Sequence, residues 1–280
     1  MAVESADLRD GPSPVGRLAR ALSAASAVIT PLEEDAAGLA RRFPGLSRRV
    51  HPLCAGLRLG ELPFAGPAGR PARIVAVDRL VAESGHADLI DACARLAGEG
   101  RRFECTIVGE GPLRGALLDR ARRLGIHGLL ALPGALAPDE VRRLVAGAAV
   151  LAAPAVASTG GGPAPVMLQA MALGTPCVAT AAPAVPGALI EGATGLRVPE
   201  HDPGALGAAV GRLLHDPELR ERLAAAARSR VEASFDLERN MARWREIVLG
   251  TGGRRRGAPT TRKDGARAPG PAVEVSSPGR

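Results

Sequence analysis

The sequence contains no uncharged apolar run of about 18 residues, the minimum that a membrane-spanning helix needs. Its first residues, MAVESADLRDGPSP, lack the order of a basic segment and then an apolar one that marks a secretory signal. These two absences lead us to expect a cytoplasmic protein. Hydrophobic residues make up 46% of the 280 positions, enough for a substantial core, so we expect a globular protein of one large or two modest domains.

Cysteine and lysine are scarce. The cysteines are widely spaced, with no C-x-x-C pair and no nearby histidine to complete a metal-ligand set; they are Cys54, Cys93, Cys105 and Cys177. We therefore expect them to be buried and reduced, and we expect no metal site and no cofactor. Only Lys263 is a lysine among the 36 basic Lys and Arg residues, as in proteins of GC-rich genomes, so arginine alone is a weak sign of phosphate binding.

The formal net charge of +7 is concentrated at the C-terminal end, where residues 251–280 hold seven arginines and lysines and two acidic residues. The rest of the chain is close to neutral, which does not indicate a nucleic-acid partner. Residues 251–280 also have too few large apolar side chains to stabilise a fold of their own. We expect a disordered basic tail there; contact with an anionic surface, such as a peripheral membrane contact, is the alternative.

Short apolar segments alternate with amphipathic ones from residue 73 onward, which predicts strands between helices. Uninterrupted apolar strands between helices are typical of a parallel sheet with both faces covered. The expected fold class is therefore α/β, a doubly wound, Rossmann-like parallel sheet. The predicted strands are RIVAV, FECTIVG, LLALPG, AVLAAP, PCVAT and GLRVPE, and the helices between them include HADLIDACARLAGEG, PLRGALLDRARRLG, APDEVRRLVAG and PVMLQAMALG.

The pattern differs at the two ends of the chain. After residue 202 it is helical throughout, with Asp202–Pro203 and Asp216–Pro217 each predicting a capping residue and the first helical residue. Residues 1–62 read as helix, strand AVIT, helix and strand VHPLC, an incomplete α/β fragment that is too small for a sheet with covered faces. We divide the chain into 1–62, 63–235, a C-terminal helix at 236–250 and the tail at 251–280.

Seven phrases in one order, over residues 27–247, resemble the family 4 (group 1) glycosyltransferases of the two-domain GT-B architecture. They are most similar to the branch that builds colanic acid and other exopolysaccharides. The phrases include RIVAVDRLVAESGHADLIDA, TIVGEGPLRGALLDRARRLGI, LPGALAPDEVRRLVAGAAVLAAP, PVMLQAMALGTPCVAT and VPGALIEGATGLRVPEHDPGAL. The resemblance implies that 63–235 binds a nucleotide-sugar donor and that 1–62 is the remnant of the acceptor domain.

The activity implied by the resemblance is transfer of a sugar from a nucleotide diphosphate sugar to a glycan or lipid-linked acceptor, with retention and without a metal. The first half of the acceptor domain has no counterpart in the sequence. A separate acceptor-domain polypeptide, or an upstream start of the same gene, would have to supply it.

The family's G-R-L-x-x-x-K-G phrase, which supplies two cations to the donor diphosphate, reads DRLVAESG here. Arg79 is retained and implied to hold the diphosphate leaving group. Asp78 replaces the glycine, and Ser84 occupies the lysine position of the substrate site. One of the two cations is therefore missing. The alternative for Arg79 is a structural ion pair with Asp78.

The family's E-x7-E pair falls on Gly161 and Gln169, so both carboxylates are absent. Gln169 can still form hydrogen bonds with a ribose. Gly160, Gly161 and Gly162 come just before a predicted helix N-terminus, and they allow the backbone to approach phosphate and sugar closely. Pro163 and Pro165 remove two N–H donors from that loop.

The resemblance places the nucleotide base near Leu136, held by backbone groups. The glycines of GEGP, residues 109–112, are expected to serve the fold rather than a ligand. The five histidines fall in separate predicted elements, without a serine or cysteine partner at a suitable spacing, so we assign them structural or surface roles; they are His51, His86, His127, His201 and His215.

Two other function classes remain open at this stage. Substitutions at the donor-site positions favour a catalytically inactive remnant that binds nucleotide at most. A third candidate, another nucleotide-dependent α/β enzyme such as a sugar-nucleotide epimerase, is disfavoured because the sequence has no G-x-G-x-x-G turn.

Overall fold

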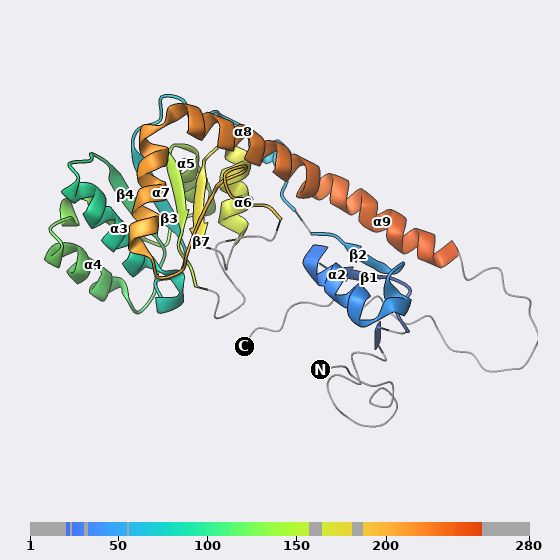
Figure 1. Ribbon diagram of the computed structural model, residues 1–280. Helices are drawn as coiled ribbons and strands as arrows, with labels where there is room; N and C mark the ends of the chain where they lie inside the picture. Colours follow the sequence, from blue (N-terminus) through green and yellow to red (C-terminus); the bar gives the residue numbers. More distant parts are fainter. Residues whose placement is uncertain are drawn as a thin grey trace, which may run out of the picture. The chain divides into compact units, whose positions relative to one another are not determined.

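The computed structural model describes residues 21–22, 24–30, 33–54, 56–156, 164–180 and 187–253. These residues belong to two compact units. The first contains the described residues of Met1–Gly56 together with the helix that starts at Leu237, and the second is Leu57–Asp236. Figure 1 shows both units, which are described separately below.

The first unit contains two short parallel strands, a helix and the last helix of the chain. In order along the sequence these are β1 (Val28–Thr30), α2 (Glu33–Arg42), the 3-10 turn η2 (Pro44–Leu46), β2 (Val50–Pro52) and α9 (Leu237–Gly253). Val28 pairs with Val50 across the two strands. The Asn240 side chain of α9 donates a 2.8 Å hydrogen bond to the Cys54 carbonyl. Both predicted strands are confirmed, whereas most of the helix predicted before them lies outside the described residues.

Six parallel strands form the sheet of the second unit, in the order β5-β4-β3-β6-β7-β8. Every residue of β6 and β7 is buried, as expected for a sheet covered on both faces. The doubly wound parallel sheet predicted from the sequence is therefore confirmed. The strands are β3 (Arg73–Val77), β4 (Glu104–Val108), β5 (Leu130–Gly134), β6 (Val150–Ala153), β7 (Cys177–Thr180) and β8 (Leu196–Val198).

Helices of the second unit pack in two groups. The helix α3 packs against α4 and α7, and α6 packs against α5 and α8, as Figure 1 shows. Short 3-10 turns lie between some of the elements. The helices are α3 (His86–Gly98), α4 (Arg114–Arg123), α5 (Pro138–Ala146), α6 (Ala164–Leu173), α7 (Pro203–His215) and α8 (Pro217–Ser234), and the turns are η3 (Leu59–Glu61), η4 (Ala82–Ser84) and η5 (His127–Leu129).

The helix starts predicted at the two Asp-Pro pairs are confirmed. Asp202 accepts a hydrogen bond from the Ala205 backbone N–H, and Asp216 accepts one from the Leu219 N–H, both at 2.8 Å. Pro203 and Pro217 occupy first-turn positions, where no backbone donor is needed. Each cap of this kind contributes about 1 kcal/mol to helix stability.

The core of the second unit joins the inner faces of the helices to the sheet. In α3, Leu89, Ile90, Cys93 and Leu96 recur at helical spacing and are all buried. They belong to one cluster with β3, β4 and the apolar face of α7. This packing fixes the start of α3 relative to the end of β3, which is where the candidate site lies.

The first and last residues of the second unit lie side by side. The Leu57 backbone N–H donates a 2.7 Å hydrogen bond to the Phe235 carbonyl, and Leu57 forms an isolated parallel bridge with Asp236. The chain therefore enters and leaves this unit at one point.

All four cysteines are free, and three of them are buried. Burial raises the pKa of the Cys177 thiol far above its usual range, which makes that sulfur unreactive. In the described ranges of the chain, no helix is both long and apolar enough to cross a bilayer.

Candidate functional site

The centre of the sheet contains a topological switch point between β3 and β6. These strands are neighbours, yet the chain leaves β3 for β4 on one side and leaves β6 for β7 on the other. The connections therefore diverge at the carboxyl ends of the two strands. Open α/β sheets bind their ligands at this position.

Arg79 lies at this switch point, two residues after the end of β3. Its side chain is exposed and makes neither a hydrogen bond nor an ion pair with another described residue. The Asp78 carboxylate instead accepts a 2.7 Å hydrogen bond from the Arg79 backbone N–H. The ion pair considered as the alternative for Arg79 is thus not formed among the described residues, and the guanidinium is free to meet an anion.

Hydrogen bonds with the turn after β4 hold the turn that carries Arg79 in place. The Leu80 N–H donates a 2.8 Å hydrogen bond to the Glu110 carbonyl, and Leu80 in turn accepts one of 3.0 Å from Leu113 N–H. Gly109 has a φ of +148°, and a Cβ there would collide with the Asp78 carbonyl oxygen. At least this glycine of GEGP is therefore required for close packing of the two turns, which holds the Arg79 backbone rigid.

Ser84 and Gly85 form the next part of the turn. Ser84 ends η4 and is buried, so a lysine at this position would need a path to the surface. Gly85 adopts a φ of +65° as the N-cap of α3, and a Cβ there would collide with the Pro154 carbonyl oxygen after β6. The Val156 N–H also donates a 2.8 Å hydrogen bond to the Glu83 carbonyl. The turn after β3 and the loop after β6 therefore touch directly.

On the β6 side, the structure describes only part of the predicted site. Gly160, Gly161 and Gly162 lie outside the described residues. Gln169 lies in the middle of α6 and is half-buried. The buried Thr180, at the end of β7, donates a short hydrogen bond to the Ala155 carbonyl and so holds the start of the β6 loop.

Leu136 lies two residues after β5, at the same edge of the sheet as Arg79 but two strands away from β3. Its half-buried side chain lines an open groove of about 430 Å³ together with Arg73, Glu140, Arg143 and Leu144. This groove includes neither Arg79 nor Gln169. The side chain of Leu136 is therefore separate from the two other predicted contacts, and a base contact there would have to use backbone groups, as the resemblance implies.

His86 also lies in this region, although the sequence predicted only a structural or surface role for it. It is the first residue of α3, its side chain is 2% exposed, and neither ring nitrogen has a hydrogen-bond partner of normal geometry. The backbone of Asp78 and Arg79 and the Asp78 carboxylate lie nearby. A signal was present in the sequence, since His86 follows directly on the phrase that carries Arg79 and Ser84.

Burial lowers the pKa of His86 below its ordinary value of 6.5, and the Asp78 charge and nearby backbone groups oppose this only in part. Between the lowered pKa and 6.5 the unfolded chain binds a proton at this position and the folded chain does not. Folding stability should therefore be complete above pH 6.5 and fall below it, by at most about 1.4 kcal/mol per pH unit. Urea unfolding from pH 5 to 8 measures this slope; His86→Asn should reduce it, and the exposed His127→Asn should leave it unchanged.

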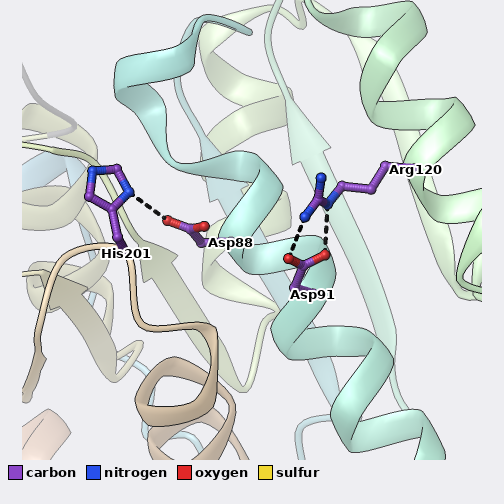
Figure 2. A network of polar contacts seen from close by, with 4 residues as sticks. All are labelled: Asp88, Asp91, Arg120 and His201. Carbon is purple, nitrogen blue, oxygen red and sulfur yellow. Dashed lines mark hydrogen bonds and ion pairs between the residues drawn. The ribbon is translucent and has the colours of Figure 1, made fainter.

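The first turn of α3 is also connected to the loop after β8. As Figure 2 shows, the His201 imidazole faces the Asp88 carboxylate, with Nδ1 3.5 Å from Oδ2. His201 has a φ of +55°, the only positive value for a non-glycine residue in the described ranges. One turn further along α3, Asp91 accepts two hydrogen bonds from Arg120 of α4, which raises the pKa of that arginine. Both faces of the α3 N-terminal half are thus held by neighbouring elements.

No three His, Cys, Asp or Glu side chains gather in a way that could hold a metal ion within the part of the chain that the structure describes. The features that the structure does bring together at the switch point are one free arginine, the bare N-terminus of α3 and a buried histidine. This combination suits an anionic group such as a diphosphate.

A family model described as "Glycosyl transferases group 1" matches residues 62–230. The chain belongs to this family, as the resemblance implied. The match covers the whole six-stranded sheet and the helices that pack on it, including the switch point.

Curated relatives include glycosyltransferases of polysaccharide synthesis. The glycogen synthase of Mycobacterium tuberculosis is 32% identical over 210 residues, 74% of this chain and 48% of that protein. The putative colanic acid biosynthesis glycosyltransferase WcaL of Salmonella typhimurium is 29% identical over 172 residues, 60% of this chain and 42% of that protein. The chain thus spans about half the length of the relatives that it matches. Because both relatives are described as transferases or synthases, they give the inactive-remnant alternative no support.

Solved structures show the same fold. Anabaena Alr3699/HepE in complex with UDP has a TM-score of 0.68 at 19% identity, over 80% of this chain and 64% of that one. The C-terminal domain of the group 1 glycosyltransferase LpcC from Francisella tularensis has a TM-score of 0.58 at 17% identity, over 65% of this chain and all of that one. The GT-B fold assignment is therefore confirmed.

Proposed function

We propose that the chain binds a nucleotide diphosphate sugar at the β3–β6 switch point and takes part in transferring the sugar to a glycan or lipid-linked acceptor in polysaccharide biosynthesis. The observation that carries this proposal is the unpaired, exposed Arg79 at the carboxyl end of β3. The UDP-glucose complex of Anabaena Alr3699/HepE, a protein of the same fold, supports the choice of ligand class.

In this proposal the guanidinium of Arg79 binds the diphosphate and stabilises the negative charge that develops when the glycosidic bond to the phosphate breaks. Gln169 accepts and donates hydrogen bonds at the ribose, and the backbone near Leu136 holds the base. The proposal assigns contacts with the phosphate and the sugar to Gly160, Gly161 and Gly162. Transfer proceeds with retention and without a metal ion.

The acceptor half belongs to the proposal as well. The chain spans about half the length of its curated relatives. In this proposal, residues outside this sequence bind the acceptor, either on a longer chain or on a separate acceptor-domain polypeptide. The cytoplasmic location expected from the sequence is also part of the proposal.

Calorimetric titration with UDP, GDP, ADP and their sugar conjugates at low salt tests donor binding. We expect one of them to bind with a dissociation constant between about 1 µM and 1 mM, the usual range for enzyme substrates. Arg79→Ala should weaken this binding at least tenfold, because a charge-assisted hydrogen bond to phosphate is worth about 1.5–3 kcal/mol.

The matched control is Arg123→Ala, which removes an exposed arginine at the end of α4, at the opposite edge of the sheet. It should leave the affinity unchanged. If no nucleotide binds, the donor-site proposal is wrong for this chain. If Arg123→Ala weakens binding as much as Arg79→Ala, attraction is general and Arg79 has no specific role.

A further inference from the structure

At the N-terminus of α3, next to Arg79, the first backbone N–H groups have no hydrogen-bond acceptor among the described residues. Gly85, its N-cap, offers no side-chain acceptor, and the hydrogen bonds of the first turn begin with the Asp88 and Leu89 N–H groups, which both donate to the Gly85 carbonyl. No described residue accepts from the N–H groups of His86 and Ala87. A helix of 13 residues with such an end attracts a negative charge.

The second observation is the His86 side chain itself. It is 98% removed from solvent and yet both ring nitrogens lack a hydrogen-bond partner. Buried polar groups without partners are rare in folded proteins and cost free energy unless something compensates for them. This imidazole lies close to the backbone of Asp78 and Arg79, the two residues that follow β3.

One charged group acts on the imidazole: Asp78, directly after β3, favours its protonation. Other charged residues nearby in the sequence are Arg79, Glu83 and Asp88, and Asp88 faces His201 of the loop after β8. Burial and the positive end of the α3 dipole oppose protonation. In the free protein these influences leave the ring neutral near pH 7.

We propose that His86 is the second cation of the donor site: it is neutral in the free protein and takes up a proton when the diphosphate of a nucleotide sugar binds beside Arg79. This inference rests on the proposed function and adds to it a role for a specific residue. It accounts for Ser84, at the lysine position, because His86 restores the missing positive charge only while the ligand is present.

Proton uptake makes donor affinity depend on pH. Binding should tighten as the pH falls from about 8 to 6, by at most tenfold per pH unit for one linked proton. A nucleotide sugar is the right probe because each of its phosphates carries one ester linkage and the shared anhydride bridge, and so has no second proton to lose in this range. Free nucleoside diphosphates do titrate there and would obscure the effect.

The experiment is calorimetry with UDP-glucose, GDP-mannose and ADP-glucose at pH 6, 7 and 8, each in two buffers of different ionisation enthalpy. The difference between the buffers gives the number of protons taken up on binding. We expect a value between zero and one for the wild type, and none for His86→Asn. The exposed His127→Asn should match the wild type. The imidazole ¹³C resonances of the wild type, followed by NMR, should show His86 change from neutral to protonated as ligand is added.

A second variant keeps the test open if His86→Asn does not fold. Asp78→Asn removes the carboxylate that favours protonation, so proton uptake should move to lower pH while binding persists. Equal proton uptake in the wild type and His86→Asn, or none in the wild type, would overturn the role of His86 and leave the donor site intact. Failure of all three nucleotide sugars to bind would overturn the proposed function, and this inference with it.

Discussion

Gly85→Ala should destabilise the second unit by about 3 kcal/mol or more. The φ of +65° at this position costs an alanine about 1–2 kcal/mol, because the Cβ approaches its own backbone. The same Cβ would also collide with the Pro154 carbonyl oxygen. Neither side can yield easily, since the Val156–Glu83 hydrogen bond holds the two segments together. Urea denaturation followed by circular dichroism measures the change in free energy of unfolding.

Gly100→Ala provides the matched control. Gly100 follows the other end of α3 with a similar φ of +76°, but a Cβ there would meet no atom within 4 Å. We expect a loss of only about 1–2 kcal/mol, from the backbone conformation alone. The difference between the two variants isolates the contact between the turn after β3 and the loop after β6. Equal losses would mean that this contact is not rigid in solution.

Arg70→Ala should cost about 3 kcal/mol of stability. The Arg70 guanidinium donates hydrogen bonds to the Ala148 carbonyl at 3.0 Å, to the Thr175 hydroxyl at 2.7 Å and to the Leu173 carbonyl at 3.2 Å, and it also bonds the Ala65 carbonyl. Removing it leaves several acceptors unpaired, some of them in buried parts of the chain such as the fully buried Thr175. A hydrogen bond to a charged group contributes about 1.5–3 kcal/mol, and the four are not additive.

Two further variants show whether geometry or charge matters at position 70. Arg70→Lys keeps the charge but cannot reach four acceptors with one ammonium, so we expect about half of the loss. Arg122→Ala removes an exposed arginine paired with Asp119 at 2.7 Å, and it should change stability by less than about 0.5 kcal/mol. If Arg70→Ala is as mild as Arg122→Ala, the guanidinium does not join these segments in solution.

The sheet could be predicted from the sequence because its strands are short apolar runs between amphipathic helices. RIVAV became β3 at the predicted residues, and the Asp202 and Asp216 caps follow from local chemistry alone. Arg70 could not be predicted in this way. Its partners lie as far as 105 residues away in the sequence, and its role depends on carbonyl groups that only the folded chain brings together.

The candidate site was predicted in part. Arg79 lies where the resemblance implied, at the carboxyl end of the central strand. The position of His86 directly after the phrase with Arg79 and Ser84 was the one signal for it in the sequence; its burial and its two ring nitrogens without a partner could be seen only in the folded chain. A periodic pattern reports which face of a helix is apolar, but not whether a polar group on that face finds a partner.

The bridge between Leu57 and Asp236 makes the second unit an inserted domain, whose ends meet while the rest of the chain continues on either side. Domains of this kind tolerate new connections between their termini. A short linker from residue 236 to residue 57 would close the unit into a ring. The ring could then be opened at the exposed turn η5, between α4 and β5, with every pair of neighbouring strands preserved. The β3–β6 switch point and the turn with Arg79 would thus survive a circular permutation that moves the chain ends to the edge of the sheet.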